Sequence, residues 1–509
     1  MNKKKVQIII LILLMAWYGL FFMYKIDLTV VDLGRHIING QMILAGQFGI
    51  LDTNFYSYTE PDFSVINHHW GGGVIFYLIW KVFGFAGLSI LYLILSLIIF
   101  YLFFRLAQKE SNFKVALIFS LLLIPLMTAR REIRPEIFSY FLMALFFWIL
   151  WHWHKGKISD KWLWLLPILE IFWVNTHIYF IFGPALIGLF LVDWVIKNKK
   201  VRPLLRSNLF INLILTSLAT LVSPFGLKGL LYPFNIFKEY GYRIVENQSV
   251  WFLENWGFKS PNLRLFEICL ILLITSFIVL LIRNRKKFSF IYFVLALVWG
   301  GLGWLAIRNF TMFGFFVLLI ISFNIKKFGF KFKKISLSVI IFVSLAIFLI
   351  SFFVYYPKLP LDQDRFGFGL MPGNNGSAQF FKDQNLQGPI FNNYDIGGYL
   401  IYYFYPQEKV FTDNRPEAYS ISHFQDIYIP AQTNNLVWQE LNKEYNFNMI
   451  FFSHRDYTNW GQQFLIERVQ DPDWAVVYFD SYAIIFLKNI EINRPIIEQY
   501  QIPKEYFGF

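Results

Sequence analysis

An aspartate follows closely on the first long apolar run of this 509-residue chain. Residues 6–24 have the length of a membrane span, and Asp32 comes within about three helical turns of their end. A carboxylate held just above a bilayer is partly desolvated, which suits a general base that takes a proton from an acceptor hydroxyl. The alternative is that Asp32 caps an interfacial helix over residues 33–46, as aspartate often does. The sequence leaves both roles open.

A second group able to do chemistry is a short stretch, residues 130–136, that holds three arginines and two glutamates. Guanidinium groups bind phosphate through a bidentate fork, so Arg131 and Arg134 are candidates for holding a lipid-linked phosphate or pyrophosphate. The alternatives are an internal cluster of arginine–glutamate ion pairs and contacts with lipid headgroups.

Further polar residues near the predicted membrane boundaries are candidates for binding substrate. Ionisable residues there are costly and are functional by default, although a buried, satisfied histidine or a polar interfacial loop is the ordinary alternative. Asp52, in Asp-Thr-Asn, is also typical of a turn. Asp413 and Arg415 follow a predicted strand at an edge where α/β sheets bind ligands, or they pair and fix their own loop. The candidates are Arg35, His36, Asp52, His68, His69, Asn175, His177, Glu246, Arg308, Asp413 and Arg415.

The sequence lacks the motifs of several reaction classes. It has no phosphate-binding Gly-Lys-Ser/Thr loop, no His-Glu-x-x-His zinc motif and no Gly-x-Ser-x-Gly elbow, so nucleotide hydrolysis and serine or zinc hydrolase chemistry lack support. No cofactor is assigned with certainty. A divalent metal, Mg²⁺ or Mn²⁺, on Asp32 stays open because carboxylates are hard ligands. Cys269 is the single cysteine, so no intramolecular disulfide can form.

Composition indicates that a membrane-embedded scaffold positions these residues. The chain is 56% hydrophobic and 16% charged, with a mean hydropathy of +0.47, whereas soluble proteins carry roughly 25% charged residues. We therefore predict a mainly α, polytopic membrane protein with about eleven transmembrane helices. The predicted spans are residues 6–24, 88–106, 115–129, 137–153, 162–176, 178–196, 209–221, 265–282, 288–306, 310–324 and 335–354.

The distribution of charge predicts the orientation. A net charge of +13 would raise nucleic acid as a partner of a soluble protein, but a bilayer sorts basic residues to the cytoplasmic side, and we expect no nucleic-acid partner. All basic clusters can face the cytoplasm only if residues 71–87 form an interfacial helix. We therefore expect a cytoplasmic amino terminus, a first outer loop at 25–87 and an external carboxyl end, in the cell (inner) membrane. The clusters are Arg105/Lys109/Lys114, Lys155/Lys157/Lys161, Lys197/Lys199/Lys200/Arg202/Arg206, Arg283/Arg285/Lys286/Lys287 and Lys326/Lys327/Lys331/Lys333/Lys334.

The last part of the chain, residues 355–509, has no long apolar run and is richer in Asn, Asp, Gln and Pro. It predicts a small extracytoplasmic α/β domain that follows a transmembrane domain at 1–354. We expect strands at 389–391, 408–411, 448–452 and 474–478, with helices between them.

This topology resembles the GT-C superfamily of integral-membrane glycosyltransferases, which includes the protein O-mannosyltransferases, the lipid A aminoarabinose transferase and oligosaccharyltransferase. The resemblance covers the whole chain, from the first helix and the outer loop with its early aspartate to the external domain. It implies that Asp32 matches the first-loop catalytic aspartate and that Glu132 or Glu136 matches the second-loop acid. His68 and His69 stand roughly where some members have His-Pro-Pro. Leu33 departs from the paired acids of the mannosyltransferases.

These observations predict a membrane glycosyltransferase that moves a sugar from a polyprenyl-phosphate-linked donor to an extracytoplasmic glycan, lipid or protein acceptor. Asp32 would activate the acceptor, and Arg131, Arg134 and Arg308 would hold the donor phosphate. One alternative is a transporter or flippase of a lipid-linked saccharide, for which Glu170 is the one clear mid-span acid. The other is a non-catalytic, membrane-anchored binding protein.

Overall fold

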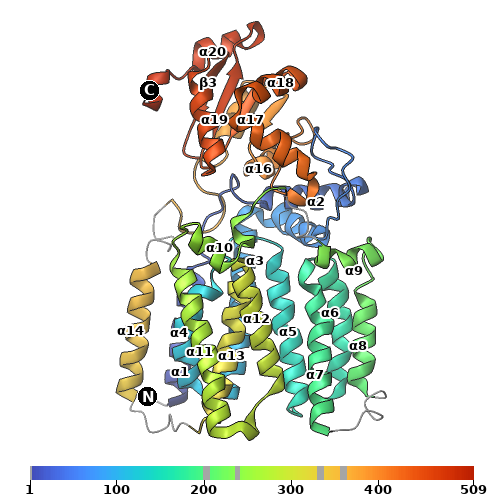
Figure 1. The fold of residues 1–509 in the computed structure, drawn as a ribbon, viewed down its shortest axis with the longest axis vertical. Coiled ribbons are helices and arrows are strands. Elements are labelled where there is room, and N and C mark those ends of the chain that lie inside the picture. The colour runs from blue at the N-terminus through green and yellow to red at the C-terminus, as the bar shows by residue number, and fades with distance from the viewer. Residues whose placement is uncertain (1–2, 199–206, 236–240, 330–336, 356–363, 509) are drawn as a thin grey trace.

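Long apolar helices run side by side along the longest axis of the molecule, and a smaller domain with a sheet lies at one end of them (Figure 1). The computed structural model describes residues 3–198, 207–235, 241–329, 337–355 and 364–508. A helix lies at each predicted span. These helices are α1 (Lys3–Leu20), α3 (Trp70–Glu110), α4 (Phe113–Met127), α5 (Glu136–His154), α6 (Leu165–Val174), α7 (Phe182–Asn198), α8 (Asn208–Ala219), α11 (Pro261–Asn284), α12 (Phe290–Leu305), α13 (Phe310–Lys327) and α14 (Leu337–Tyr355).

Five of the described helical segments are long and apolar enough to cross a membrane, judged by length and composition. Four shorter apolar helices accompany them, at Phe113–Met127, Asn208–Ala219, Phe290–Leu305 and Phe342–Tyr355. The mainly helical, membrane-embedded architecture is therefore confirmed. The count of eleven spans stays a prediction.

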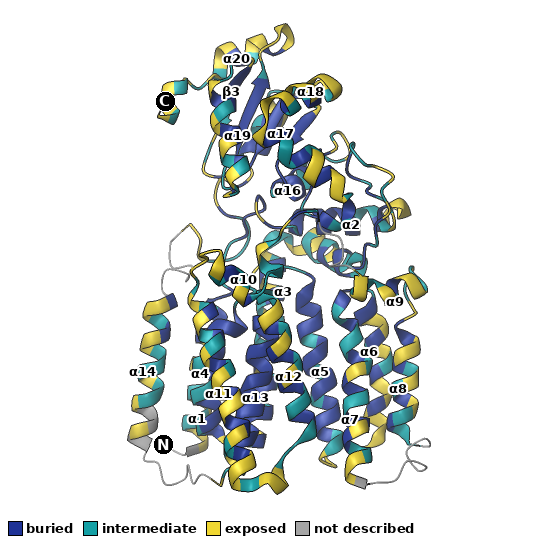
Figure 2. Cartoon of the chain, in the orientation of Figure 1, coloured by how far each residue is buried: buried dark blue, intermediate teal, exposed yellow. Residues whose placement is uncertain are grey.

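Helix α13 forms the centre of the bundle. Every side chain from Phe310 to Asn324 is buried, and α13 packs against α3, α4, α11 and α12. A helix that is apolar all round is either a lipid-exposed span or a buried core helix, and the burial of α13 shows that it is the latter. In contrast, α14 and the outer faces of α8 and α11 are largely exposed (Figure 2), as expected of surfaces that face lipid.

Basic residues of separate clusters gather at the end of the bundle away from the sheet domain. Lys109, Lys155 and Lys157 all contact the ring of Trp151, and Lys326 donates to the backbone carbonyl of Lys109. The predicted grouping of the clusters on one side is thus confirmed for these residues. Lys199, Lys200, Arg202, Arg206, Lys331, Lys333 and Lys334 lie outside the described residues.

The first outer segment places two helices across the other end of the bundle. Helix α2 (Leu33–Leu44) packs on the start of α3, and Figure 1 shows both between the bundle and the sheet domain. The predicted helix at 71–87 is observed as the first part of α3, which a kink at Gly84 separates from the part that continues to Glu110. Gly84 adopts φ 63° and ψ −163°, which only glycine tolerates readily.

Two glycines allow α2 and α3 to approach each other closely. A Cβ on Gly40 would lie 2.3 Å from the carbonyl oxygen of Gly73, and one on Gly73 would lie 2.8 Å from the carbonyl oxygen of His36. Real Cβ atoms do not approach backbone oxygens so closely, so a side chain at either position must separate the helices. This contact fixes His36 on α2 relative to the histidines that precede α3.

We expect Gly40→Ala to lower thermal stability, because α2 must move away from α3. The rearrangement should cost about 1–3 kcal/mol. Gly301→Ala on α12 is the matched control, since its Cβ enters open space and alanine favours a helix. Thermal midpoints of the two variants in detergent test this. Equal midpoints would contradict the close packing.

The carboxyl-terminal region contains a four-stranded sheet in the order β1-β2-β4-β3. Strands β1 (Ile390–Asn392) and β2 (Met449–Phe452) are parallel, with Phe391 opposite Ile450, and β4 (Ile484–Lys488) runs antiparallel to β2 and to β3 (Trp474–Phe479). The helices around it are α15 (Gly376–Asp383), α16 (Gly397–Phe404), α17 (Ile429–Thr433), α18 (Asn435–Tyr445), α19 (Asn459–Gln470) and α20 (Arg494–Tyr500). The predicted α/β character is confirmed.

One predicted strand is wrong and one observed strand was not predicted. Residues 408–411 form only an isolated bridge, between Val410 and Ser57 of the first outer loop. The N–H of Phe411 donates to the side chain of Asn392 and not to a neighbouring strand. Strand β4 lies in an apolar run that the sequence analysis left unassigned.

The sheet domain contacts helix α2 directly. Helix α16 packs on α2, and a Cβ on Gly34 would lie 2.8 Å from the carbonyl oxygen of Gly398. Buried side chains of α2, α16 and the bundle belong to one continuous apolar core. The boundary at 354/355 stays a prediction.

Candidate functional site

Asp32 lies directly before α2 but does not cap it, because no backbone N–H of the helix donates to its side chain. Its Oδ2 lies 3.4 Å from Nη2 of Arg35 and 3.3 Å from Nε2 of His36. Its Oδ1 lies 3.8 Å from Nε of Arg134. Burial opposes ionisation, but Arg134, His36 and Arg35 together hold the pKa of Asp32 well below its usual range. The carboxylate is therefore ionised at neutral pH.

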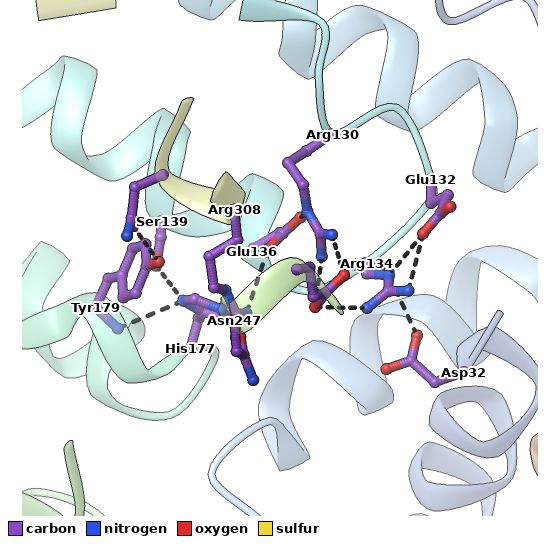
Figure 3. Close-up of polar contacts among 12 residues, drawn as sticks. Asp32, Arg130, Glu132, Arg134, Glu136, Ser139, His177, Tyr179, Asn247 and Arg308 are labelled. Carbon is purple, nitrogen blue, oxygen red and sulfur yellow. Dashed lines mark hydrogen bonds and ion pairs between the residues drawn. The ribbon is translucent and has the colours of Figure 1, made fainter. Parts of the chain in front are cut away.

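Beside Asp32, a network of arginines and glutamates joins three segments (Figure 3). Arg130 binds Glu136, at the start of α5, with 2.6 Å between Nε and Oε1, and it also binds Glu246 in the 3-10 turn η5 (Val245–Asn247). Arg134 binds the same Glu246, at 3.4 Å. Burial opposes ionisation of Glu246, but Arg130 and Arg134 hold its pKa far below the usual range. The network is charged and mostly buried.

Arg308 completes this network from the opposite side. It lies in the 3-10 turn η7 (Ile307–Asn309) before α13, and its Nη2 is 3.6 Å from Oε2 of Glu136. Its Nη1 donates to Oδ1 of Asn247 at 3.0 Å. The guanidinium groups of Arg130, Arg134 and Arg308 therefore converge around Glu136 and Glu246, and Nε of Arg308 keeps a hydrogen-bond donor without a partner in the described chain. Such an arrangement suits an anion.

Three buried histidines, His36, His68 and His177, and the half-buried His69 extend the site along the contact between α2 and α3. The ring of His69 lies 5.4 Å from that of His36, 3.9 Å from that of His68 and 5.1 Å from that of His177, measured between centroids. Nδ1 of His177 is 2.8 Å from the hydroxyl of Ser139 on α5. Burial lowers the pKa of His36 and His69, and that of His68 to about 3. These three rings are therefore neutral at neutral pH.

Four buried polar atoms around these residues have no hydrogen-bond partner within the described chain. They are Oδ1 of Asp32, Nδ1 of His36, Nε2 of His69 and Nε of Arg308. Buried polar atoms nearly always have a hydrogen-bond partner in folded proteins, and a buried polar atom without one costs free energy of folding. Their concentration around the arginine network indicates a place where a polar ligand binds.

A resident divalent metal does not fit these donors. Among the described residues, no group of three or more His, Cys, Asp or Glu side chains could hold a metal ion. Asp32 faces the guanidinium groups of Arg35 and Arg134, whose charge opposes a second cation. No step of the chemistry below depends on a metal.

Several predicted site residues lie apart from this cluster. Arg131 lies over the ring of Tyr24, with 4.6 Å between its Cζ and the centroid. Glu132, in contrast, is exposed at the edge of the network, where it pairs with Arg134 at 2.8 Å. Asp52 is exposed. The side chain of Asn175 accepts from Trp70 and donates to the backbone carbonyls of Ile171 and Val222.

Asp413 and Arg415 form a buried pair with each other, at 2.7 and 2.8 Å. Arg415 also donates to Oδ1 of Asn54 in the first outer loop. The interpretation that this pair fixes its own loop is thus the one the geometry favours. Their neighbour Asn414 accepts from Nε of Arg35 at 3.4 Å, so the sheet domain reaches the helix that carries Asp32.

Sequence reasoning missed Arg130 and Asn247 as members of the site. Arg130 stands in the same basic stretch as the two arginines chosen, but the direction of each side chain in an irregular loop has no sequence period. Asn247 directly follows the candidate Glu246. Its role becomes visible only once η5 and η7 are seen in contact, through the backbone bond from Ile307 to Gln248.

Three solved structures are similar to this fold. Archaeal oligosaccharyltransferase AglB from Archaeoglobus fulgidus, in complex with an inhibitory peptide and a dolichol-phosphate, has a TM-score of 0.56 at 11% identity over 96% of this chain and 75% of its own. Arabinofuranosyltransferase AftD from Mycobacteria gives 0.53 at 12%, over 94% and 40%. ArnT from Cupriavidus metallidurans in the apo state gives 0.51 at 14%, over 95% and 98%. No protein-family model and no curated protein sequence matches the chain.

At such low identity the likeness establishes the fold alone. The chain has the architecture of GT-C membrane glycosyltransferases, which confirms the predicted resemblance at the level of fold.

The buried neutral histidines make stability depend on pH. An unfolded histidine titrates near 6.5, whereas the pKa of His68 in the fold is about 3, so the unfolded state binds more protons as pH falls below 6.5. We expect His68 alone to remove about 2 kcal/mol of stability between pH 6.5 and 5. Thermal midpoints at pH 8 and pH 5 test this. His68→Gln should show a smaller difference between the two pH values than wild type, and an unchanged difference would contradict the assignment.

Proposed function

We propose that this protein is a membrane glycosyltransferase that transfers a sugar from a polyprenyl-phosphate donor to an acceptor hydroxyl. One observation carries the proposal: the ionised carboxylate of Asp32 keeps a buried oxygen without a hydrogen-bond partner, beside an arginine network in which Nε of Arg308 also has no hydrogen-bond partner in the described chain. A general base and an anion-binding group are the two parts that this reaction needs. The fold shared with AglB, AftD and ArnT supports it.

The arginine network is suited to the donor phosphate. Guanidinium groups bind phosphate oxygens at fixed geometry, and negative charge grows on the leaving phosphate as the bond to the sugar breaks. Arg134 and Arg308 are the ligands that we assign, since Nε of Arg308 has no partner in the described chain. Arg130 is the least exposed of the three guanidinium groups and joins Glu136 to Glu246, so we assign it to positioning.

Donor binding would also activate the base. Arg134 is the first of the cations that lower the pKa of Asp32. When a phosphate neutralises Arg134, that influence weakens, and the pKa of Asp32 rises toward a range in which it accepts a proton more readily. The acceptor would then be deprotonated only when the donor is in place.

The acceptor side is assigned from the arrangement of the chain. Helix α2, which Asp32 precedes, lies at the end of the bundle that carries the sheet domain, whereas the described lysines of the basic clusters gather at the other end. Because basic ends face the cytoplasm, we propose that the site and the sheet domain are extracytoplasmic. The acceptor is then a glycan, lipid or protein outside the cytoplasm.

The transporter alternative rests on one observation. Glu170 of α6 is fully buried, and neither carboxyl oxygen has a hydrogen-bond partner in the described chain. A mid-span acid is a common feature of transporters. If Glu170→Gln protein transfers sugar normally but no longer moves a lipid-linked saccharide across vesicles, transport is the second activity.

Asp32→Asn should remove transfer activity by about 10²–10⁴-fold, because the amide cannot take the acceptor proton. Asp62→Asn, an exposed aspartate of the same outer loop, is the matched control. The measurement is release of polyprenyl phosphate from a polyprenyl-phosphate sugar by purified protein in the presence of acceptor. Transfer by Asp32→Asn at the wild-type rate would rule out the general base.

Arg134→Gln should weaken donor binding by about 10- to 100-fold, the value of one charge-assisted hydrogen bond. Arg131→Gln should have a smaller effect, because Arg131 lies over Tyr24. The apparent donor KM of each variant, measured with the same acceptor, compares the two. A larger effect at Arg131 would overturn the assignment of phosphate ligands.

A further inference from the structure

A cavity of about 310 Å³ lies at the end of the bundle away from Asp32. The ends of α5, α7, α12 and α13 surround it, together with the 3-10 turn η6 (Arg285–Lys287). None of the predicted catalytic or substrate-binding residues lines it. A volume near 300 Å³ lies at the lower end of the range for small-molecule sites.

Positive charge dominates this cavity. Five lysines line it, at positions 155, 197, 286, 287 and 327. Carboxylates compensate two of them: Lys155 lies 3.1 Å from Glu110, and Lys197 lies 2.7 Å from Asp193. Among the described residues, Lys286, Lys287 and Lys327 have no carboxylate partner. Three uncompensated ammonium groups around one concavity are unfavourable unless an anion or solvent screens them.

The walls of the cavity are aromatic as well as basic. Trp151 and Tyr292 line it, and both donate to Oε1 of Glu110, at 2.6 and 2.9 Å. These bonds fix the carboxylate that holds Lys155, so this side of the cavity is built and not a chance meeting of surface side chains. Phe288 and Phe323 add apolar surface. An anion that also carries apolar groups fits such a lining better than a free ion does.

The position of the cavity indicates the source of that anion. It opens where helices of membrane-spanning length end, which is the depth of the lipid headgroups. Basic pockets between transmembrane helices bind anionic headgroups, and each lysine near the surface contributes to the attraction.

We propose that this cavity binds the phosphate-bearing headgroup of an anionic phospholipid, in the leaflet opposite the candidate active site. Lys286, Lys287 and Lys327 contact the phosphate, and the aromatic side chains contact the glycerol and the first acyl carbons. The bound lipid joins the ends of α5, α7, α12 and α13. This site is independent of the proposed transferase activity, because binding is measured without donor or acceptor.

The test is a titration of the full-length protein, purified in neutral detergent, with phosphatidylglycerol, phosphatidylcholine and glycerol 3-phosphate. We expect wild type to bind phosphatidylglycerol at least tenfold more tightly than either of the other two. Lys286→Gln/Lys287→Gln should weaken phosphatidylglycerol binding by roughly 10- to 30-fold. Lys286→Arg/Lys287→Arg, which keeps both charges, should retain it.

The matched control is Lys114→Gln/Lys161→Gln, which removes the same charge at the same end of the bundle but outside the cavity. It should change binding less than threefold. Equal losses in the two double variants would overturn the proposal, since general charge attraction would then account for binding. If phosphatidylcholine binds as tightly as phosphatidylglycerol, the site does not select an anionic headgroup. If glycerol 3-phosphate binds as tightly as phosphatidylglycerol, the ligand is not the lipid. Unchanged thermal midpoints of the variants without lipid show that each is folded.

Discussion

Arg130 makes the ion pairs on which the rest of the candidate site depends. Its guanidinium group joins Glu136 on α5 to Glu246 in the loop after α9 (Gly226–Asn235), residues 110 positions apart in the chain. Buried charges are stable only when partners and hydrogen bonds compensate them. Removing Arg130 would take one cation from each of these two carboxylates, which also hold Arg134 and Arg308. One side chain thus positions the residues that we assign to the donor phosphate.

The close packing of α2 on α3 is the second constraint. The contact between Gly40 and Gly73 brings the neutral rings of His36 and His69 together, so this wall of the site adds no positive charge. The positive charges of the site are those of the arginines, and Asp32 lies against two of them, Arg35 and Arg134. The sheet domain supports the same helix through Gly34 and Asn414.

Much of this arrangement follows from sequence, for identifiable reasons. The spans are long apolar runs in the sequence. The basic clusters between them indicate which ends of the spans lie together on one side. Asp32, Arg134, Glu136, His177, Glu246 and Arg308 were all predicted as candidates, because ionisable residues near a membrane boundary are rare and costly. These six lie in or beside the cluster that the structure shows.

What could not be predicted depends on contacts between distant segments. Nothing local distinguishes Arg130, which binds Glu246, from Arg131, which lies over Tyr24. Residues 408–411 have the apolar character of a strand, but their backbone meets the Asn392 side chain and Ser57. The capping role that the sequence leaves open for Asp32 is not observed, because its carboxylate lies against the side chains of Arg35, His36 and Arg134 and accepts from no backbone N–H of α2.

A structure of the protein with bound polyprenyl phosphate tests the central claim most directly. The account predicts phosphate oxygens within about 3 Å of the guanidinium groups of Arg134 and Arg308, with Oδ1 of Asp32 facing the position of the sugar. A phosphate bound elsewhere, with Arg130, Arg134 and Arg308 still engaged only with Glu136 and Glu246, would contradict it.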